Sequence, residues 1–163
     1  VRRKVSVVSH ETFLYDNLTL YENLKFYGRM YDVPDLDYRI SEVVSQIQLE
    51  SRLYDQLGTL SRGLQQRASI ARAVIQNPSI MLLDEPEVGL DPHGIIMMRN
   101  MLDTIAHPGR TVVMTTHNLE QGLDLGNKVV ILNKGELVYE AFKHEIEIEN
   151  FRKIYDHYTG MSK

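Results

Sequence analysis

The 163-residue sequence contains no cysteine, no tryptophan and no long hydrophobic run. Without cysteine the chain can form no disulfide bond, no thiolate metal site and no thiol nucleophile. This composition agrees with a reducing compartment, and we expect the cytoplasm. The longest apolar runs, such as SIMLL and KVVIL, are far shorter than the roughly 20 residues that cross a bilayer. Any role at a membrane is therefore expected to depend on a partner.

An excess of positive charge is also absent. Lysine and arginine number 18 against 22 acidic residues, which gives a net charge of -4. No basic residues cluster strongly, so we expect no nucleic-acid partner. The hydrophobic fraction of 43% suits one globular domain with a core of its own. The chain begins at Val1 and runs straight into a strand-like pattern, which we interpret as a piece of a longer protein.

Strand and helix patterns alternate along the chain, and this order predicts an α/β fold with a mainly parallel sheet. Thr19 and Glu22 have the spacing of a capping box at the start of a helix. We expect the three strands before residue 118 to be buried, because they are apolar and rich in β-branched residues. The predicted elements are a strand at 5–9, helices at 20–33, 37–49 and 62–76, a strand at 79–84, a helix from 92, a strand at 110–117, a helix at 118–125, a hairpin at 128–140 and a helical tail at 142–163.

Two adjacent acidic residues, Asp84 and Glu85, end the predicted strand at 79–84. In doubly wound folds the carboxyl ends of parallel strands form the ligand-binding edge of the sheet. A carboxylate there can hold Mg²⁺, and a second one can orient an attacking water or take its proton. We predict the first role for Asp84 and the second for Glu85.

Phosphate contacts are predicted at two further points. Ser61 stands at the start of the helix at 62–76, where free N–H groups and the positive end of the helix dipole favour anions. Gly63 allows a close approach of the backbone. His117 follows the next apolar strand, and its imidazole could contact a terminal phosphate. Together these residues indicate phosphoryl transfer.

Four motifs then occur in a fixed order: LSRGLQQR at 60–67, IMLLDE at 80–85, GLDP at 89–92 and TTH at 115–117. They resemble the signature motif, the Walker B strand with its glutamate, the D-loop and the switch histidine of ABC transporter ATP-binding subunits. The resemblance covers roughly residues 5–139. It implies a P-loop NTPase-like fold with a helical subdomain at about 18–76, the C-terminal part of the ATPase core at about 77–141, and a helical tail at 142–163.

The resemblance also implies cofactors and partners. ATP and Mg²⁺ would lie between two ATP-binding subunits in a head-to-tail dimer, on the cytoplasmic side of a membrane that holds a permease subunit. Ser61, Gly63 and Gln65 would serve the partner's nucleotide, and Asp91 would link the two sites. Asp84, Glu85 and His117, with His10, would serve the subunit's own nucleotide.

The sequence departs from the family pattern at three places. Arg62 and Leu64 replace the glycine and glutamine of the commonest signature. His10 occupies the position of the Q-loop glutamine, and in this it resembles the ATP-binding subunit of the haem exporter and related exporters. Two roles are open for His10: it contacts the metal and its water in place of the glutamine, or it is merely a polar residue at the end of a strand. No G-x-x-x-x-G-K-[ST] stretch occurs, so the phosphate-binding P-loop and its strand are missing. We expect an N-terminally truncated chain that is inactive alone.

Alternative interpretations remain at this stage. The chain could be a non-catalytic partner or regulatory module that offers only a signature face. It could also be half of a chromosome-maintenance or DNA-repair ATPase, although such a half should follow a long heptad segment and residues 1–60 contain none. Arg67 and Arg72 are expected to solvate their helix. Part of the FLYDNL segment at 13–18 is expected to be a docking surface for the membrane partner.

Overall fold

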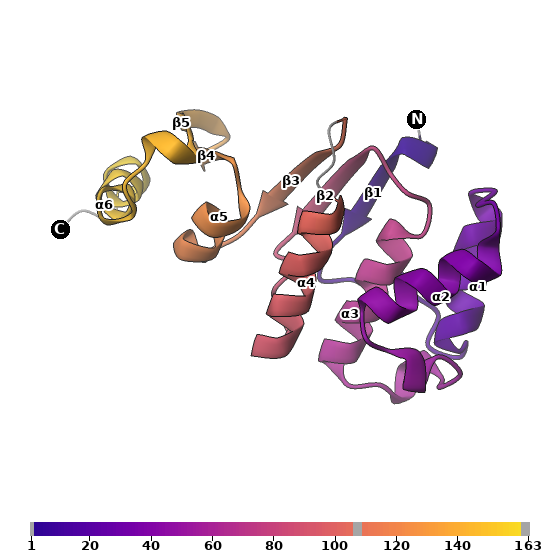
Figure 1. Cartoon of the computed structure of the whole chain (residues 1–163). Coiled ribbons are helices and arrows are strands. Elements are labelled where there is room, and N and C mark those ends of the chain that lie inside the picture. Colours follow the sequence, from indigo (N-terminus) through magenta and orange to yellow (C-terminus); the bar gives the residue numbers. More distant parts are fainter. Residues whose placement is uncertain (1, 106–108, 161–163) are drawn as a thin grey trace. The chain divides into compact units, whose positions relative to one another are not determined.

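The computed structural model describes residues 2–105 and 109–160. It divides into two compact units, Val1–Thr115 and Thr116–Lys163, which we describe separately. Figure 1 labels their elements. The first unit contains β1 (Val5–Val8), α1 (Leu20–Met30), α2 (Leu36–Gln46), α3 (Arg62–Val74), β2 (Ile80–Asp84), α4 (Pro92–Ile105) and β3 (Thr111–Thr115), with short 3₁₀ turns at Arg2–Lys4, Glu50–Arg52 and Leu57–Thr59. The second contains α5 (Leu119–Leu125), β4 (Lys128–Asn133), β5 (Glu136–Phe142), a 3₁₀ turn at Lys143–Glu145 and α6 (Ile148–Thr159).

The three strands of the first unit form a parallel sheet with β2 in the middle (Figure 1). Val8 is opposite Leu83, and Leu83 is opposite Met114, so the strands run in register. Their carboxyl ends consequently meet at one edge of the sheet. The predicted parallel α/β arrangement is confirmed.

Helix α1 begins where the sequence predicts. The Thr19 side chain accepts a hydrogen bond from the Glu22 N–H at 3.1 Å, and the Glu22 carboxylate accepts one from the Thr19 N–H at 2.8 Å. The Thr19 N–H and the Thr19 hydroxyl both donate to the Glu22 carboxylate, and these two bonds favour its charged form and lower the pKa of Glu22. The capping box therefore fixes the start of α1 and aims Leu20 and Leu24 into the core, where both are fully buried.

Helices α2 and α3 end two or three residues earlier than predicted, at Gln46 and Val74. In each case a residue just beyond the end adopts a left-handed backbone, Gln48 with φ 58° and Asn77 with φ 54°. Such a conformation stops a right-handed helix. These two turns were not evident from the apolar periodicity.

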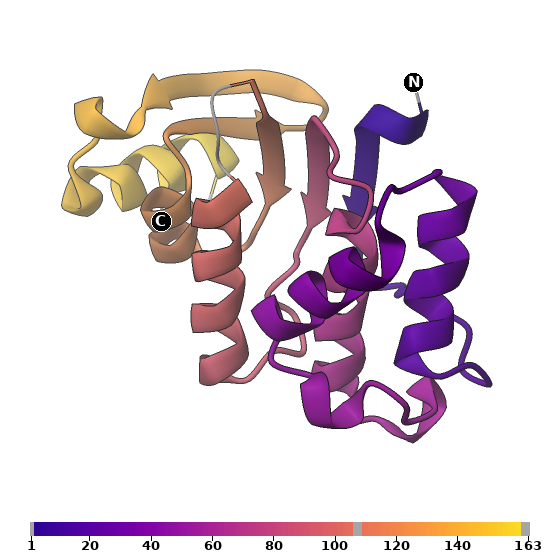
Figure 2. The ribbon, with the colours of Figure 1, turned by 45° about the vertical axis from the view of Figure 1, so that its right-hand side comes forward.

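Helix α3 is buried along most of its length and lies beside α4 (Figure 2). Ala68, Ala71 and Ala73 are all inaccessible to solvent. Their small side chains permit close packing of α3 against β1 and against the other helices of this unit. Helix α3 is thus the element around which the first unit packs.

The prediction of fully buried strands is wrong for one face of the sheet. Val8 and Leu83 are 0% and 3% exposed, because their face packs against the helices. On the opposite face, Val7, Leu82 and Val113 lie in register and are 39%, 39% and 52% exposed. We call this second face the open sheet face. Alternation along each strand gives it an apolar surface that no described residue of the first unit covers.

We expect the isolated chain to self-associate through the open sheet face, because contiguous exposed apolar surface recruits other chains. Val113→Lys should reduce the apparent mass in light scattering by placing a charge on the β3 part of that face. Tyr38→Lys is the matched control, since Tyr38 is 74% exposed on α2. Wild-type chain that stays monomeric, or equal effects of both substitutions, would contradict this expectation.

The second unit is a hairpin packed with two helices. The turn between β4 and β5 contains Lys134 at φ 51° and Gly135 at φ 84°, the left-handed pair of a type I′ turn, which confirms the predicted hairpin. Leu123, Ile131 and Phe151 form the small core of this unit. The predicted helical tail at 142–163 is confirmed over Ile148–Thr159. It is wrong for the first residues, because β5 continues to Phe142 and a 3₁₀ turn follows at Lys143–Glu145. Residues 161–163 of that prediction lie outside the described part.

Among the described residues, no helix combines the length and the apolar character that a membrane span requires.

Candidate functional site

The carboxyl edge of the sheet brings Asp84 and Glu85 together with Thr115, the last residue of β3. Asp84 and Thr115 are directly opposite each other in the register. The Thr115 hydroxyl donates a hydrogen bond to Asp84 Oδ1 at 2.6 Å. The Glu85 N–H donates to Thr115 Oγ1 at 3.2 Å and to the Thr115 carbonyl oxygen at 3.1 Å. One residue of β3 therefore contacts both acidic residues.

Glu85 has an unusual backbone. Its φ is 47°, in the left-handed region that residues with a side chain rarely adopt. Strained backbone of this kind persists where the surrounding structure holds it, and it is concentrated at functional sites. The chain turns here from β2 into the loop at 86–91.

His10 lies in the bend that follows β1 and is exposed. Because β1 is parallel to β2, this bend is at the same edge of the sheet as Asp84. The structure thus places His10 at the predicted edge.

Arg72 of α3 holds the segment that carries His10. Its guanidinium donates to the Val7 carbonyl oxygen at 2.6 Å and to the Thr12 carbonyl oxygen at 3.1 Å. The same group lies over the rings of Phe13 and Tyr27, 5.5 Å from each centroid. Burial lowers the pKa of Arg72. The expectation that Arg72 solvates its helix is wrong, because the side chain is buried and donates to two backbone carbonyl groups.

A second group of predicted residues surrounds the start of α3. Ser61 is the N-cap residue and is exposed, but its hydroxyl makes no capping hydrogen bond. A Cβ atom at Gly63 would lie 3.0 Å from the Gly89 carbonyl oxygen, a tighter contact than most side chains make, so glycine favours this approach. The Gln65 amide donates to the Leu57 carbonyl oxygen at 3.1 Å and steadies the turn before the helix.

Asp91 is bound to α3 and to α4. Its Oδ1 accepts hydrogen bonds from the Gly94 N–H at 2.7 Å and from the Arg67 guanidinium at 2.8 Å. These two bonds, the first being the larger cause, lower the pKa of Asp91. The Arg67 side chain is 9% exposed, so the expectation that it solvates the helix is wrong. One guanidinium nitrogen, Nη2, donates to this carboxylate, which lies 24 residues away in the sequence.

The loop between Glu85 and Asp91 makes a further contact with α3. Gln66 is buried, and its amide donates to the Pro86 carbonyl oxygen at 3.3 Å. With the Arg67–Asp91 pair and the close approach of Gly63 to Gly89, this bond holds the loop at 86–91 against the first turns of α3.

His117 belongs to the second unit, where it is exposed and stands one residue before Asn118, the N-cap of α5. The Asn118 side chain accepts a hydrogen bond from the Gln121 N–H at 3.1 Å. His117 and the acidic residues Asp84 and Glu85 thus belong to different units, which are described separately. Its part in the site stays a prediction from the sequence.

The carboxylate of Asp84 could be one ligand of a magnesium ion whose other ligands come from water and phosphate. Mg²⁺ in such sites is held by one or two carboxylates rather than by a protein cage. Asp84 is exposed at the strand end, and hydroxyl donation to Oδ1 fixes the orientation of its carboxylate. In residues 2–105 and 109–160, no three His, Asp or Glu side chains gather as a self-sufficient metal site. This arrangement suits a metal that arrives with a phosphate ligand.

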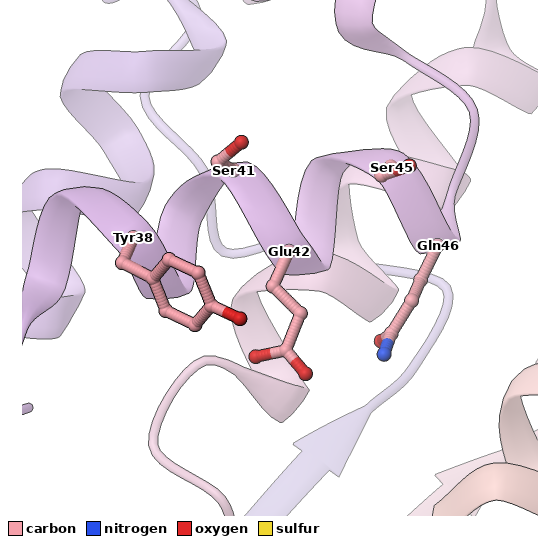
Figure 3. Close-up of a pocket in the computed structure, with 5 residues that line it drawn as sticks. All are labelled: Tyr38, Ser41, Glu42, Ser45 and Gln46. Carbon is pink, nitrogen blue, oxygen red and sulfur yellow. The ribbon is translucent and has the colours of Figure 1, made fainter.

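A hollow of about 420 Å³ on α2 of the first unit is not a candidate ligand site. Its lining residues all come from α2, and Figure 3 shows Ser41 pointing away from Tyr38 and Glu42. Glu42 accepts a hydrogen bond from Arg39 at 2.8 Å. Arg39 in turn donates to the Val74 and Ile75 carbonyl oxygens at the end of α3. These side chains hold two helices together and do not converge on a ligand.

Sequence reasoning missed three functional neighbours: Thr115, Arg67 and Arg72. The parallel register offered a signal for Thr115, because the ends of adjacent parallel strands lie together. The two arginines carried no such signal, since their partners lie far away in the sequence: Asp91 for Arg67, and Val7 and Thr12 for Arg72.

Both the sequence and the fold of this chain are similar to those of known proteins. The sequence profile of the ABC transporter family matches residues 1–88. The chain is 31% identical to Nod factor export ATP-binding protein I of Cupriavidus metallidurans over 89% of its own length and 48% of that protein. It is 34% identical to the spermidine/putrescine import ATP-binding protein PotA of Pasteurella multocida, over 89% of this chain and 40% of that protein. The chain thus spans less than half the length of these two relatives.

The fold is also found among solved structures. The subunit cbiO1 of Clostridium perfringens, part of the ABC transporter complex cbiONQ, superposes with a TM-score of 0.78 at 22% identity, covering 94% of this chain and 63% of that one. The α/β fold is therefore that of the P-loop NTPase domain of ABC ATPases, as predicted. On its matching profile and motifs, the chain belongs to the ABC transporter family as part of an ATP-binding domain.

Proposed function

We propose that this chain is the part of an ABC transporter ATP-binding subunit that runs from the Q-loop to beyond the switch histidine. In the full-length subunit it would bind ATP with Mg²⁺ and hydrolyse it. The observation that carries this proposal is the pair of acidic residues at the carboxyl edge of the parallel sheet, held by Thr115. A module that offered only a signature face would have no use for two positioned carboxylates, and this favours the catalytic subunit.

The residues divide the work by their chemistry. Bound Mg²⁺ would neutralise phosphate charge. Asp84 would hold the ion, and Glu85 would orient the attacking water and accept its proton. His117 would contact the terminal phosphate, and His10 would act from the bend after β1.

The start of α3 would serve a second nucleotide, which a second ATP-binding subunit holds in a head-to-tail dimer. The Ser61 hydroxyl is not used in capping and stands beside the free N–H groups of the helix. Gly63 and Gln65 shape the same turn. Asp91, fixed by Arg67, would link this face to the subunit's own site.

A transmembrane permease is the proposed membrane partner, reached from the cytoplasmic side. Exposed aromatic side chains support this, since Tyr15 and Phe26 are 49% and 44% exposed and pack edge to face at 5.4 Å. Tyr15 belongs to the segment at 13–18 that was predicted to dock, and Phe26 packs against it. The direction we propose is export, and the resemblance at His10 makes haem the first substrate to test.

A binding experiment tests the proposed function. The phosphate-binding loop and its lysine supply most contacts to the phosphates in this family, and the chain contains neither. We expect the 163-residue chain alone to show no micromolar binding of Mg-ATP in calorimetry and no hydrolysis. The full-length subunit should bind and hydrolyse ATP.

The control for this experiment is the full-length subunit with its P-loop lysine replaced by alanine, which should behave like the short chain. Tight Mg-ATP binding by the 163-residue chain would reveal a different nucleotide site. Absence of hydrolysis by the full-length subunit, with and without its permease, would contradict the catalytic proposal and favour the regulatory module.

A further inference from the structure

The hydroxyl of Thr115 has one proton and two lone pairs. In its contacts it acts both as a hydrogen-bond donor and as an acceptor. An ionised aspartate can only accept, so the 2.6 Å bond requires the Thr115 proton to lie toward Asp84 Oδ1. A lone pair then accepts the Glu85 N–H at 3.2 Å. These two contacts set the orientation of the hydroxyl. Through it, the Asp84 side chain is joined to the backbone N–H of Glu85.

We propose that Thr115 is a positioning residue for both acidic residues of the site. Its hydroxyl fixes the carboxylate of Asp84 in the orientation that a metal ligand needs. It also holds the backbone of Glu85, at φ 47°, in the left-handed conformation that directs its side chain. Thr115 does this from the neighbouring strand and need not touch the nucleotide itself.

The catalytic meaning of this inference rests on the proposed function, but the positioning itself can be examined in the chain alone. Thr115→Val is the informative change, because valine keeps the β-branched shape and the strand preference while removing the hydroxyl. Thr115→Ser keeps the hydroxyl. Thr111→Val is the matched control, since Thr111 lies on the same face at the opposite end of β3.

The first readout is the hydrogen exchange of the Glu85 amide, measured by NMR in this chain. Loss of one hydrogen bond should speed exchange about two- to tenfold in Thr115→Val. The bond to the Thr115 carbonyl oxygen remains, so the effect should not be larger. Thr115→Ser and Thr111→Val should exchange at the wild-type rate.

The second readout is metal-dependent binding of a non-hydrolysable ATP analogue by the full-length subunit. Thr115→Val should raise the Mg²⁺ concentration for half-maximal binding about two- to tenfold, while binding without metal stays unchanged. Its kcat should fall more than its KM changes, because the positioned groups act on the chemical step. Thr115→Ser should restore both values.

These measurements separate the two proposals. A wild-type full-length subunit that does not hydrolyse ATP contradicts the proposed function, while the Glu85 exchange rate still tests the positioning. Unchanged exchange in Thr115→Val overturns the positioning role. If exchange is faster but the Mg²⁺ dependence and kcat are unchanged, the positioning by Thr115 has no effect on hydrolysis. Thr115 is then only a structural link between β2 and β3.

Discussion

Replacing Glu85 by glutamine in the full-length subunit should slow ATP hydrolysis about 10²- to 10⁴-fold, the usual cost of removing a general base. Glutamine keeps the size of the side chain and part of its hydrogen bonding but lacks the basic oxygen. The backbone contacts of residue 85 with Thr115 do not depend on the side chain and should persist. Single-turnover measurements should therefore show a slow chemical step with normal ATP affinity.

Asp84→Asn is the informative comparison for this variant. Loss of charge beside Mg²⁺ should weaken nucleotide binding as well as turnover. Glu85→Gln with ATP should instead accumulate a long-lived dimer in size-exclusion chromatography, because binding assembles the interface and hydrolysis would release it. Near-normal turnover of Glu85→Gln without an ATP-dependent dimer would remove Glu85 from its assigned role.

Arg72→Met should lower the free energy of unfolding of the chain by about 3 kcal/mol, since hydrogen bonds to charged groups contribute about 1.5–3 kcal/mol each. The change leaves the carbonyl oxygens of Val7 and Thr12 without their buried donor. Urea titration followed by circular dichroism measures the loss. Amide exchange in the segment at 9–15 should also become faster, because this segment loses its attachment to α3.

The matched control for Arg72 is Arg62→Met, on the same helix but exposed. An exposed substitution of this kind should change the free energy of unfolding by no more than about 0.5 kcal/mol. Arg72→Lys retains the charge but cannot span both carbonyl oxygens as a fork, so its stability should be intermediate. Equal stability of Arg72→Met and Arg62→Met would show that the two hydrogen bonds contribute nothing net.

Local features of this fold could be predicted because their causes lie within a few residues. The capping box needs only Thr19 and Glu22, and the hairpin needs only the turn at Asn133–Gly135. The strand ending at Asp84 and the helix beginning at Pro92 are similarly local. For these elements the residue types themselves impose the backbone conformation, and the structure confirms the predictions.

The remaining features depend on partners far away in the chain. Arg72 reaches carbonyl groups 60 and 65 residues away, and Thr115 reaches Asp84 across 31 residues. An arginine on an amphipathic pattern is ordinarily solvated, and only the folded arrangement supplies acceptors that bury it. For the same reason the exposure of one sheet face could not be deduced, because an apolar strand does not specify which of its faces is covered.

The attachment of the loop at 86–91 to α3 has a mechanical consequence. Contacts at Pro86, Gly89 and Asp91 join the loop to the helix at its beginning, middle and end. A segment held at three points has little freedom to bend separately from the helix, and we expect the two to move as one body. A rotation of α3 would then displace the backbone directly after Glu85, so that a movement of this helix would reach the carboxylate for which we propose the hydrolytic role without an intervening hinge.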